Sequence, residues 1–238
     1  MGRTCPSLKP KSFLREDFFI SIMDNEIIRS TIIFVKDKLS GAEGGHDWYH
    51  IERVYKNCML IVKNESCDLE VVQLAALLHD IADSKFHNGD ESVGPRMARK
   101  FLESHNVNTQ TVNHVVNIIE NISFKGGNVQ KTFSSIELDI VQDADRLDAI
   151  GAIGIARAFN YGGFKNRALY DPSINPDLLM DKTTYKNSTS PTINHFYEKL
   201  LLLKDKMNTI TGKKIAEKRH LFMEDFLRIF YAEWNGEQ

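Results

Sequence analysis

Apolar residues recur along most of the chain at intervals of mostly three and four, the spacing of a buried helix face. The first such run extends from Ile27 to Leu39, and Gly41, Gly44 and Gly45 then predict its end. Further helices are predicted over residues 47–63, 69–81, 91–105, 109–122, 134–149, 150–159, 193–207 and 213–231. Because no alternating strand pattern accompanies them, the sequence predicts an all-α fold.

The prolines divide the chain into regions. Pro95 is the one proline between residues 20 and 160, and proline breaks helix interiors, so this region is free to be nearly continuous helix. Residues 160–191 are rich in Gly, Asn, Asp, Pro, Ser and Thr, which predicts a long surface loop. Long loops in compact domains often cover binding sites. We therefore expect this loop to be a mobile cover over a pocket.

The first 22 residues differ from the rest. Their apolar stretch, SFLREDFFISI, is interrupted by Arg15, Glu16 and Asp17, whereas a secretory signal needs an uninterrupted apolar core. Met23 begins a good helix entry, with Asp24 as its predicted N-cap. The sequence thus predicts a poorly ordered extension over residues 1–22 and one folded domain over residues 23–238.

Composition narrows the partners. The chain has 30 Lys and Arg against 32 Asp and Glu, a net charge of -2 that excludes a broad basic surface for nucleic-acid polymers. No apolar run approaches the roughly 18 residues that a membrane span needs, including the leucines near Leu200. Three cysteines without metal-like spacing fit a reducing compartment. We expect a soluble cytoplasmic protein, and the sequence is compatible with a homo-oligomer.

A His-Asp pair ends the most apolar predicted helix. His79 and Asp80 follow LAALL, where polar side chains are costly unless they are paired or coordinated. Together they offer the nitrogen and oxygen donors that suit Mn, Fe, Zn or Ni. The alternative, which the dipeptide alone favours, is a histidine that caps its helix and an aspartate that starts the next turn. His50 lies early in the preceding predicted helix, and Arg53 shares its face.

Three aspartates lie in the segment DADRLD. Asp143 and Asp145 are separated by about 200° around a helix, so only one of them is expected to face a given site. Asp148 shares a face with Asp145. Its simpler role is to pair with an arginine such as Arg146 or Arg53.

The order His50, His79-Asp80, Asp145 resembles the H…HD…D pattern of the HD-domain metal-dependent phosphohydrolase superfamily. The segments HDWYHIERV, LAALLHDIADSKF, VQDADRLDAIGAIGIARAF and NHFYEKLLLLKDKMNTITGKKIAEKRHLFMEDFL are similar to its small single-domain YedJ/YpgQ-like branch. The resemblance covers roughly residues 24–235. It implies an HD-domain helical bundle, with the metal held between the central helices.

By this resemblance, four side chains would be ligands of one divalent metal ion: His50, His79, Asp80 and Asp145. Mn, Mg, Co, Ni, Fe and Zn all remain open as its identity, because the ligand set tolerates several metals. A bound metal would lower the pKa of water and polarise a phosphoryl oxygen. The implied activity is hydrolysis of a phosphoester or phosphoanhydride in a small substrate, with a nucleotide as the substrate class. Removal of pyrophosphate from a triphosphate and dephosphorylation of a monophosphate both stay open, and the branch favours the former.

Further residues are candidates for binding and catalysis. Asp83 lies one turn beyond the His-Asp pair and is the candidate general base or water-positioning residue, with a solvated carboxylate as the alternative. Arg53, Lys85 and Lys125 are candidates for binding phosphate oxygens, and Arg146 is a weaker one. Individually, such cations more often lie on the surface or in salt bridges.

Two rival functions use the same fold. A di-iron oxygenase would need additional metal ligands, and His87 and His114 are the histidines that could supply them. The favoured alternative is that these two side chains support the ligands from behind or face solvent. A catalytically silent nucleotide-sensing module would keep the pocket without turnover. Retention of all four polar ligands argues against that loss. His195, in the segment NHFYEKLL, is a further candidate for lining the pocket.

Overall fold

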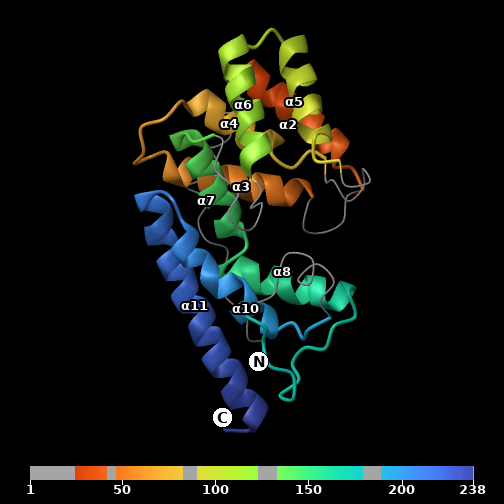
Figure 1. Cartoon of the computed structure of the whole chain (residues 1–238), viewed down its shortest axis with the longest axis vertical. Helices are drawn as coiled ribbons and strands as arrows, with labels where there is room; N and C mark the ends of the chain where they lie inside the picture. The colour runs from red at the N-terminus through yellow and green to blue at the C-terminus, as the bar shows by residue number, and fades with distance from the viewer. Residues whose placement is uncertain (1–24, 42–46, 83–89, 123–132, 179–188, 238) are drawn as a thin grey trace, which may run out of the picture.

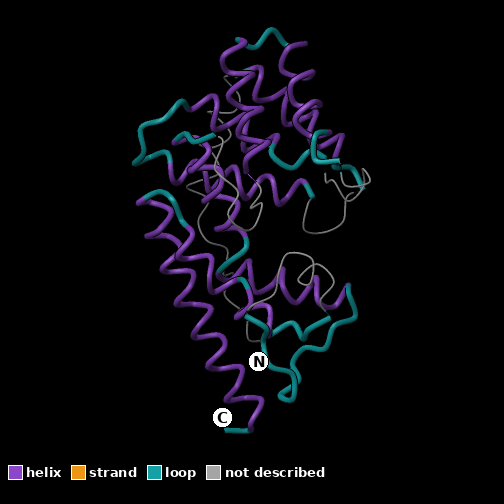
Figure 2. The backbone as a smooth tube through the Cα atoms, viewed as in Figure 1, coloured by secondary structure: helices purple, strands orange, loops and turns teal. Residues whose placement is uncertain are grey.

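The structure, a computed structural model, describes residues 25–41, 47–82, 90–122, 133–178 and 189–237. Over these ranges all regular secondary structure is helical, so the all-α prediction is confirmed (Figure 2). The helices are α2 (Glu26–Lys38), α3 (Trp48–Ile61), α4 (Leu69–Leu78), α5 (Val93–Ser104), α6 (Thr109–Ile122), α7 (Ile136–Asp148), α8 (Gly151–Phe164), α10 (Asn194–Glu198), the 3₁₀ helix η2 (Leu200–Lys206) and α11 (Ile210–Asn235).

The helices form two groups along the long axis of the molecule (Figure 1). Helices α2 to α7 make the upper group, and α8, α10 and the far end of α11 make the lower group. Helix α7 reaches down from the upper group, and α11 runs along one side from α7 toward the C-terminus. Helix α11 packs against both α7 and α8, so it joins the two groups.

Helix α4 lies at the centre of the upper group. Every residue from Val71 to Leu78 is buried, and the helix packs against α2, α3, α6 and α7. A helix that is apolar on all sides is stable only when other elements surround it. The side chain of Asp68 caps its first turn by accepting from the amide of Val71. His79, at the C-terminal end of this buried helix, therefore lies next to the core.

Two predicted helix starts are wrong by a few residues. The N-cap of α2 is Asn25 rather than Asp24, because the Asn25 side chain accepts from the amides of Ile27 and Ile28. Helix α11 begins at Ile210 rather than at residue 213, because Thr209 caps it by accepting from the amide of Gly212. Both caps are short polar side chains that satisfy amides of a first helical turn.

The predicted 160–191 loop begins later than expected, because α8 continues to Phe164. The last turn of α8 contains Gly162 and Gly163. A Cβ atom on Gly162 would lie 2.1 Å from the hydroxyl oxygen of Thr192, so this glycine lets α8 approach the returning chain. The chain beyond is tied back by hydrogen bonds from the amides of Thr192 and Ile193 to the carbonyls of Ala168 and Leu169.

The predicted 193–207 helix is instead two short pieces, α10 and η2, separated at Lys199, whose φ and ψ are -145° and -55°. The second piece is a 3₁₀ helix, in which side chains three residues apart lie above one another. Leu200 and Leu203 have this spacing, and both are buried. The leucines of η2 therefore bury a narrow stripe of side chains, whereas an α-helix would bury a wider face.

A tight turn joins α7 to α8 below the upper group. Gly151 has a φ of +74°, and a Cβ atom there would lie 3.0 Å from the side chain of Arg219 in α11. Arg219 donates to the carbonyl of Leu147 and, at 2.9 Å, to the side-chain oxygen of Asn57 in α3. Arg219 of α11 therefore contacts α3, the end of α7 and the first residue of α8.

In the described ranges, no helix is both long enough and apolar enough to cross a membrane. The proposed N-terminal extension, residues 1–22, lies outside the described residues and stays a prediction.

Candidate metal centre

Three of the four predicted ligands come together between helices of the upper group. His50 of α3, His79 at the end of α4 and Asp145 of α7 each offer one ligand atom, and these atoms lie within 4.8 Å of one another. The Nε2 atom of His50 is 3.5 Å from the Oδ1 atom of Asp145, and the two imidazole rings are 5.4 Å apart between centroids. Two nitrogens and one carboxylate at this separation are a suitable ligand set for a divalent cation.

His79 is oriented by its own helix. Its Nδ1 atom lies 2.9 Å from the carbonyl oxygen of Ala76, and because a carbonyl only accepts, Nδ1 carries the hydrogen. The Nε2 atom then has a lone pair, and it is buried with no hydrogen-bond partner in the described part of the chain. A buried acceptor without a partner costs about 1–3 kcal/mol. A bound cation would remove that cost, so the residues present fit a metal.

His50 is oriented by a carboxylate on another helix. It lies in the first turn of α3, where the side chain of the N-cap residue Asp47 accepts from the His50 amide. The His50 side chain is buried, and its Nδ1 atom lies 2.8 Å from Oδ2 of Asp148. The carboxylate accepts, so Nδ1–H donates and the lone pair of Nε2 faces Asp145. Metal-binding histidines commonly have their second nitrogen held by a carboxylate in this way.

Asp148 is held by two arginines as well as by His50. Arg53 donates from Nε to Oδ1 at 2.6 Å and from Nη2 to Oδ2 at 3.0 Å. Arg157 of α8 donates to Oδ2 at 2.6 Å. Burial raises the pKa of Asp148, but the hydrogen bonds from His50 and Arg53 and the charge of Arg157 lower it well below its usual range. Asp148 is therefore ionised throughout the neutral range.

Asp143 points away from the cluster. It is fully buried, and its oxygens accept from the amides of Asn208 and Thr209 and from both of their side chains, at 2.8–3.2 Å. These contacts fasten α7 to the start of α11. The two aspartates two residues apart thus face different neighbours, as the geometry of a helix predicts.

Asp80 is not a member of the three-residue cluster, although it follows His79 directly and is half-buried. Its place among the ligands stays a prediction. Three further predicted residues, Asp83, Lys85 and Lys125, lie outside the described residues.

The predicted pairing of Asp148 with an arginine is confirmed, and of the two alternatives the partner is Arg53. Arg53 forms the ion pair, which commits two of its donors to Asp148 and leaves its side chain 30% exposed. Arg146 instead donates to the carbonyl of Lys206 and to Gln142, because it lies on the face of α7 that meets the start of α11. Phosphate binding by Arg53 stays a prediction.

Two other histidines named in the sequence analysis, His114 and His195, lie outside the three-residue cluster. The Nε2 atom of His114 is 3.0 Å from the hydroxyl of Ser135 and 3.3 Å from the carboxylate of Glu137, and His114 is not in the cluster. His195 is not in the cluster either, and burial, followed by the charges of Lys199 and Arg167, lowers its pKa to about 4. His87 lies outside the described residues.

The sequence interpretation allowed for an ion pair between Asp148 and Arg53 but missed the contacts of Asp148 with His50 and Arg157. His50 and Arg53 lie three residues apart on one helix face, and this spacing was a signal that one anion serves both. Asp148 was available as that anion. The contact of Arg157 had no comparable signal, because it depends on the turn at Gly151 that brings α8 back under α7.

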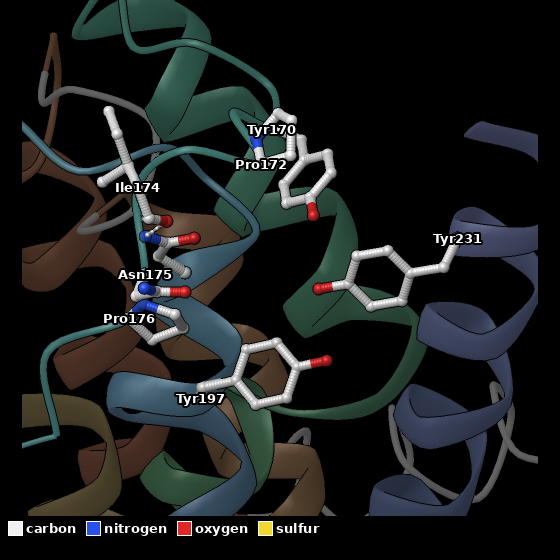
Figure 3. Close-up of a pocket in the computed structure, with 8 residues that line it drawn as sticks. Tyr170, Pro172, Ile174, Asn175, Pro176, Tyr197 and Tyr231 are labelled. Atoms are coloured by element: carbon white, nitrogen blue, oxygen red, sulfur yellow. Dashed lines mark hydrogen bonds between the residues drawn. The ribbon is translucent and has the colours of Figure 1, made fainter. Parts of the chain in front are cut away.

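A separate groove of about 270 Å³ lies in the lower group (Figure 3). Tyr170, Tyr197 and Tyr231 turn their hydroxyl groups into it, and Pro172 and Pro176 form part of its wall. Among the described residues, none of the predicted ligands or phosphate-binding candidates lines it. The first part of the predicted 160–191 loop thus packs with α10 and α11, and residues 179–188, in the rest of that loop, lie outside the described residues.

The HD-domain family model matches residues 47–150, the range that contains His50, His79 and Asp145. The chain is also 39% identical over 198 residues to the uncharacterised protein YpgQ of Bacillus subtilis (strain 168). That alignment covers 82% of this chain and 87% of YpgQ.

Solved structures with the same fold support this likeness. A crystal structure of an HD-superfamily hydrolase from Bacillus thuringiensis has 45% sequence identity and a TM-score of 0.71, and the match covers 87% of this chain and 96% of that one. The crystal structure of Bacillus subtilis YpgQ in complex with ADP has 32% identity and a TM-score of 0.67, with coverage of 87% and 97%.

Proposed function

The chain belongs to the HD-domain family, and from this premise we propose that it is a metal-dependent phosphohydrolase that acts on a nucleotide. The resemblance found in the sequence is thereby confirmed at the level of the family. One observation carries the proposal: the buried Nε2 atom of His79 has no hydrogen-bond partner among the described residues, and His79 lies beside His50 and Asp145.

The ligands would be His50, His79 and Asp145, together with Asp80 from the family pattern. When bound, a divalent cation lowers the pKa of water and polarises a phosphoryl oxygen. The Asp145 side chain is 44% exposed, so the cluster is open to solvent on that side. Catalytic metal sites keep such an open position, whereas structural sites are closed by protein ligands.

The protein side chains have separate tasks in this proposal. Asp148 holds the hydrogen of His50 on Nδ1, and the carbonyl of Ala76 does the same for His79, so in both histidines the lone pair is on Nε2. Asp83 is proposed to position the attacking water or accept its proton. Lys85, Lys125 and Arg53 are proposed to bind phosphate oxygens.

The substrate class rests on a relative and on charge. A Bacillus subtilis YpgQ structure holds ADP, and we infer that this chain also takes a nucleotide. The nearly balanced charge of 30 basic and 32 acidic residues favours a small substrate over a nucleic-acid polymer. Release of pyrophosphate from a nucleoside triphosphate is the proposed reaction, with monophosphate hydrolysis as the alternative.

The test is an activity screen with separate product assays. The purified chain is incubated with nucleoside mono-, di- and triphosphates in Mn²⁺, Mg²⁺, Co²⁺ or Ni²⁺, and phosphate and pyrophosphate are measured independently. Pyrophosphate release from triphosphates is expected, and the His79→Ala variant should release none. Bound metal without product from any nucleotide would favour a sensing module. Two irons per chain would favour an oxygenase.

A further inference from the structure

We propose that Asp148 is a positioning residue that fixes the tautomer and orientation of His50, and that Arg157 of α8 holds Asp148 in that position. This inference rests on the proposed function, because it assigns a role relative to His50 as a metal ligand. It adds a residue of α8, outside the family pattern of ligands, to the control of the site.

The contact between His50 and Asp148 determines which nitrogen faces the cluster. An ionised carboxylate has no hydrogen to donate, so the 2.8 Å contact requires that Nδ1 of His50 carries the hydrogen. The lone pair is then on Nε2, 3.5 Å from Asp145. Without Asp148, the hydrogen is free to move to Nε2, and a protonated Nε2 cannot bind a cation.

Two arginines prevent the carboxylate of Asp148 from turning. Arg157 donates from one nitrogen to both the backbone carbonyl of Asp148, at 3.1 Å, and its side-chain Oδ2, at 2.6 Å. Arg53 donates to Oδ1 and Oδ2 from the other side. The Asp148 side chain is 2% exposed, so water cannot replace these donors. Any rotation of the carboxylate would break its hydrogen bonds to both guanidinium groups, so the carboxylate stays aimed at His50.

A purely structural reading of the same contacts is that the ion pairs join α3, α7 and α8. The two roles predict different metal affinities for variants of Asp148. A structural role predicts a loss of stability only, whereas a positioning role predicts weaker and altered metal coordination in a chain that is still folded.

The experiment is a titration of the purified chain with Co²⁺, followed by its visible absorption spectrum, which reports coordination geometry. Asp148→Ala should weaken Co²⁺ binding by about 10–100-fold, the usual effect of losing an orienting partner, and should change the spectrum. Asp148→Asn retains an oxygen that can accept from His50 and should recover part of the affinity. Circular dichroism verifies that each variant is folded.

Asp143→Asn is the matched control. It removes a charge from an equally buried carboxylate on the same helix, five residues before Asp148, but Asp143 contacts the start of α11 instead of His50. It should lower the midpoint of thermal unfolding and leave the Co²⁺ affinity and spectrum unchanged. Arg157→Met keeps the contact between His50 and Asp148 and should weaken Co²⁺ binding by about tenfold or less.

The possible outcomes distinguish failure of the positioning role from failure of the proposed function. If the native chain binds Co²⁺ and Asp148→Ala binds it equally well with the same spectrum, the positioning role is wrong and the proposed function stands. If the native chain binds no Co²⁺, both are wrong. If Asp148→Ala does not fold, Asp148→Asn and Arg157→Met decide, and native affinity and spectrum in both would overturn the positioning role.

Discussion

The two sides of helix α7 carry aspartates with opposite surroundings. On one side Asp143 is 0% exposed, and the amides and side chains of Asn208 and Thr209 occupy its oxygens. On the other side the Asp145 side chain is 44% exposed and faces His50. Burial alone would select Asp143 as the functional residue. The identity of the partners, backbone amides or a histidine cluster, therefore separates a structural carboxylate from a candidate ligand.

Asp148 combines features of both sides. It is as buried as Asp143, but its partners are His50, Arg53 and Arg157 rather than backbone amides. Its contacts therefore orient His50 in the cluster and also join α7 to α3 and α8. The predictions below test whether the two sides of α7 are as separate as their contacts indicate.

The largest effect is expected from removing a ligand on the Asp145 side. His50→Ala, His79→Ala and Asp145→Ala should each abolish turnover, and each should weaken metal binding by more than the roughly 100-fold upper range for orienting residues. Metal content after gel filtration, measured by elemental analysis, checks this. If Asp143→Ala empties the site while Asp145→Ala leaves it filled, the assignment of the two sides is reversed.

Asp80→Ala tests whether the metal has a fourth protein ligand. The family pattern implies that Asp80 is a ligand, whereas the cluster in the structure consists of His50, His79 and Asp145. We expect Asp80→Ala to lose turnover and most of its bound metal. Elemental analysis that finds full metal occupancy in a folded Asp80→Ala variant would restrict the ligands to the other three.

A different signature is expected on the structural side. Asp143→Ala leaves the amides of Asn208 and Thr209 without their acceptor, and each buried donor that loses its partner costs about 1–3 kcal/mol. The free energy of unfolding should fall by about 3 kcal/mol while metal content stays native. Urea unfolding monitored by circular dichroism measures the loss. Unchanged stability would mean that water replaces the carboxylate at the start of α11.

The sequence predicted the helices well where burial is one-sided or complete. The apolar run of α4 allows only a central helix, and the structure buries all of it from Val71 to Leu78. It failed where local signals have two meanings. The composition of residues 160–191 predicted a loop from residue 160, but α8 continues to Phe164, and Gly162 in its last turn allows the close approach of Thr192.

For the site, the family pattern placed His50, His79 and Asp145 in one group, and the structure brings them together. Their role as ligands stays a prediction. Their orientation could not be predicted. The contact between Arg157 and Asp148 depends on how α8 crosses beneath α7, which no spacing in the sequence encodes. Candidate ligands are thus easier to find from sequence than the residues that orient them.

The smallest effect is expected from a single methyl group beside Asp143. A Cβ atom on Gly212 would lie 2.3 Å from Oδ2 of Asp143 and 2.8 Å from the hydroxyl oxygen of Thr209. Both oxygens are already engaged with each other, so the carboxylate must shift and its hydrogen bonds must lengthen. Overpacking of this kind costs about 1–3 kcal/mol. Gly212→Ala should lower the free energy of unfolding by that amount, measured in urea, and leave Co²⁺ affinity native.

Gly163→Ala is the matched control, because a Cβ atom on Gly163 in α8 would meet nothing within 4 Å. Alanine is the better helix former by about 0.5–1 kcal/mol, so this variant should be as stable as the native chain or slightly more so. The difference between the two alanine variants isolates the contact with Asp143 from the general effect of replacing a helical glycine. If Gly212→Ala is as stable as Gly163→Ala, the packing at Asp143 is loose. If Gly212→Ala instead weakens Co²⁺ binding, the two sides of α7 are coupled, and the separation between Asp143 and Asp145 is wrong.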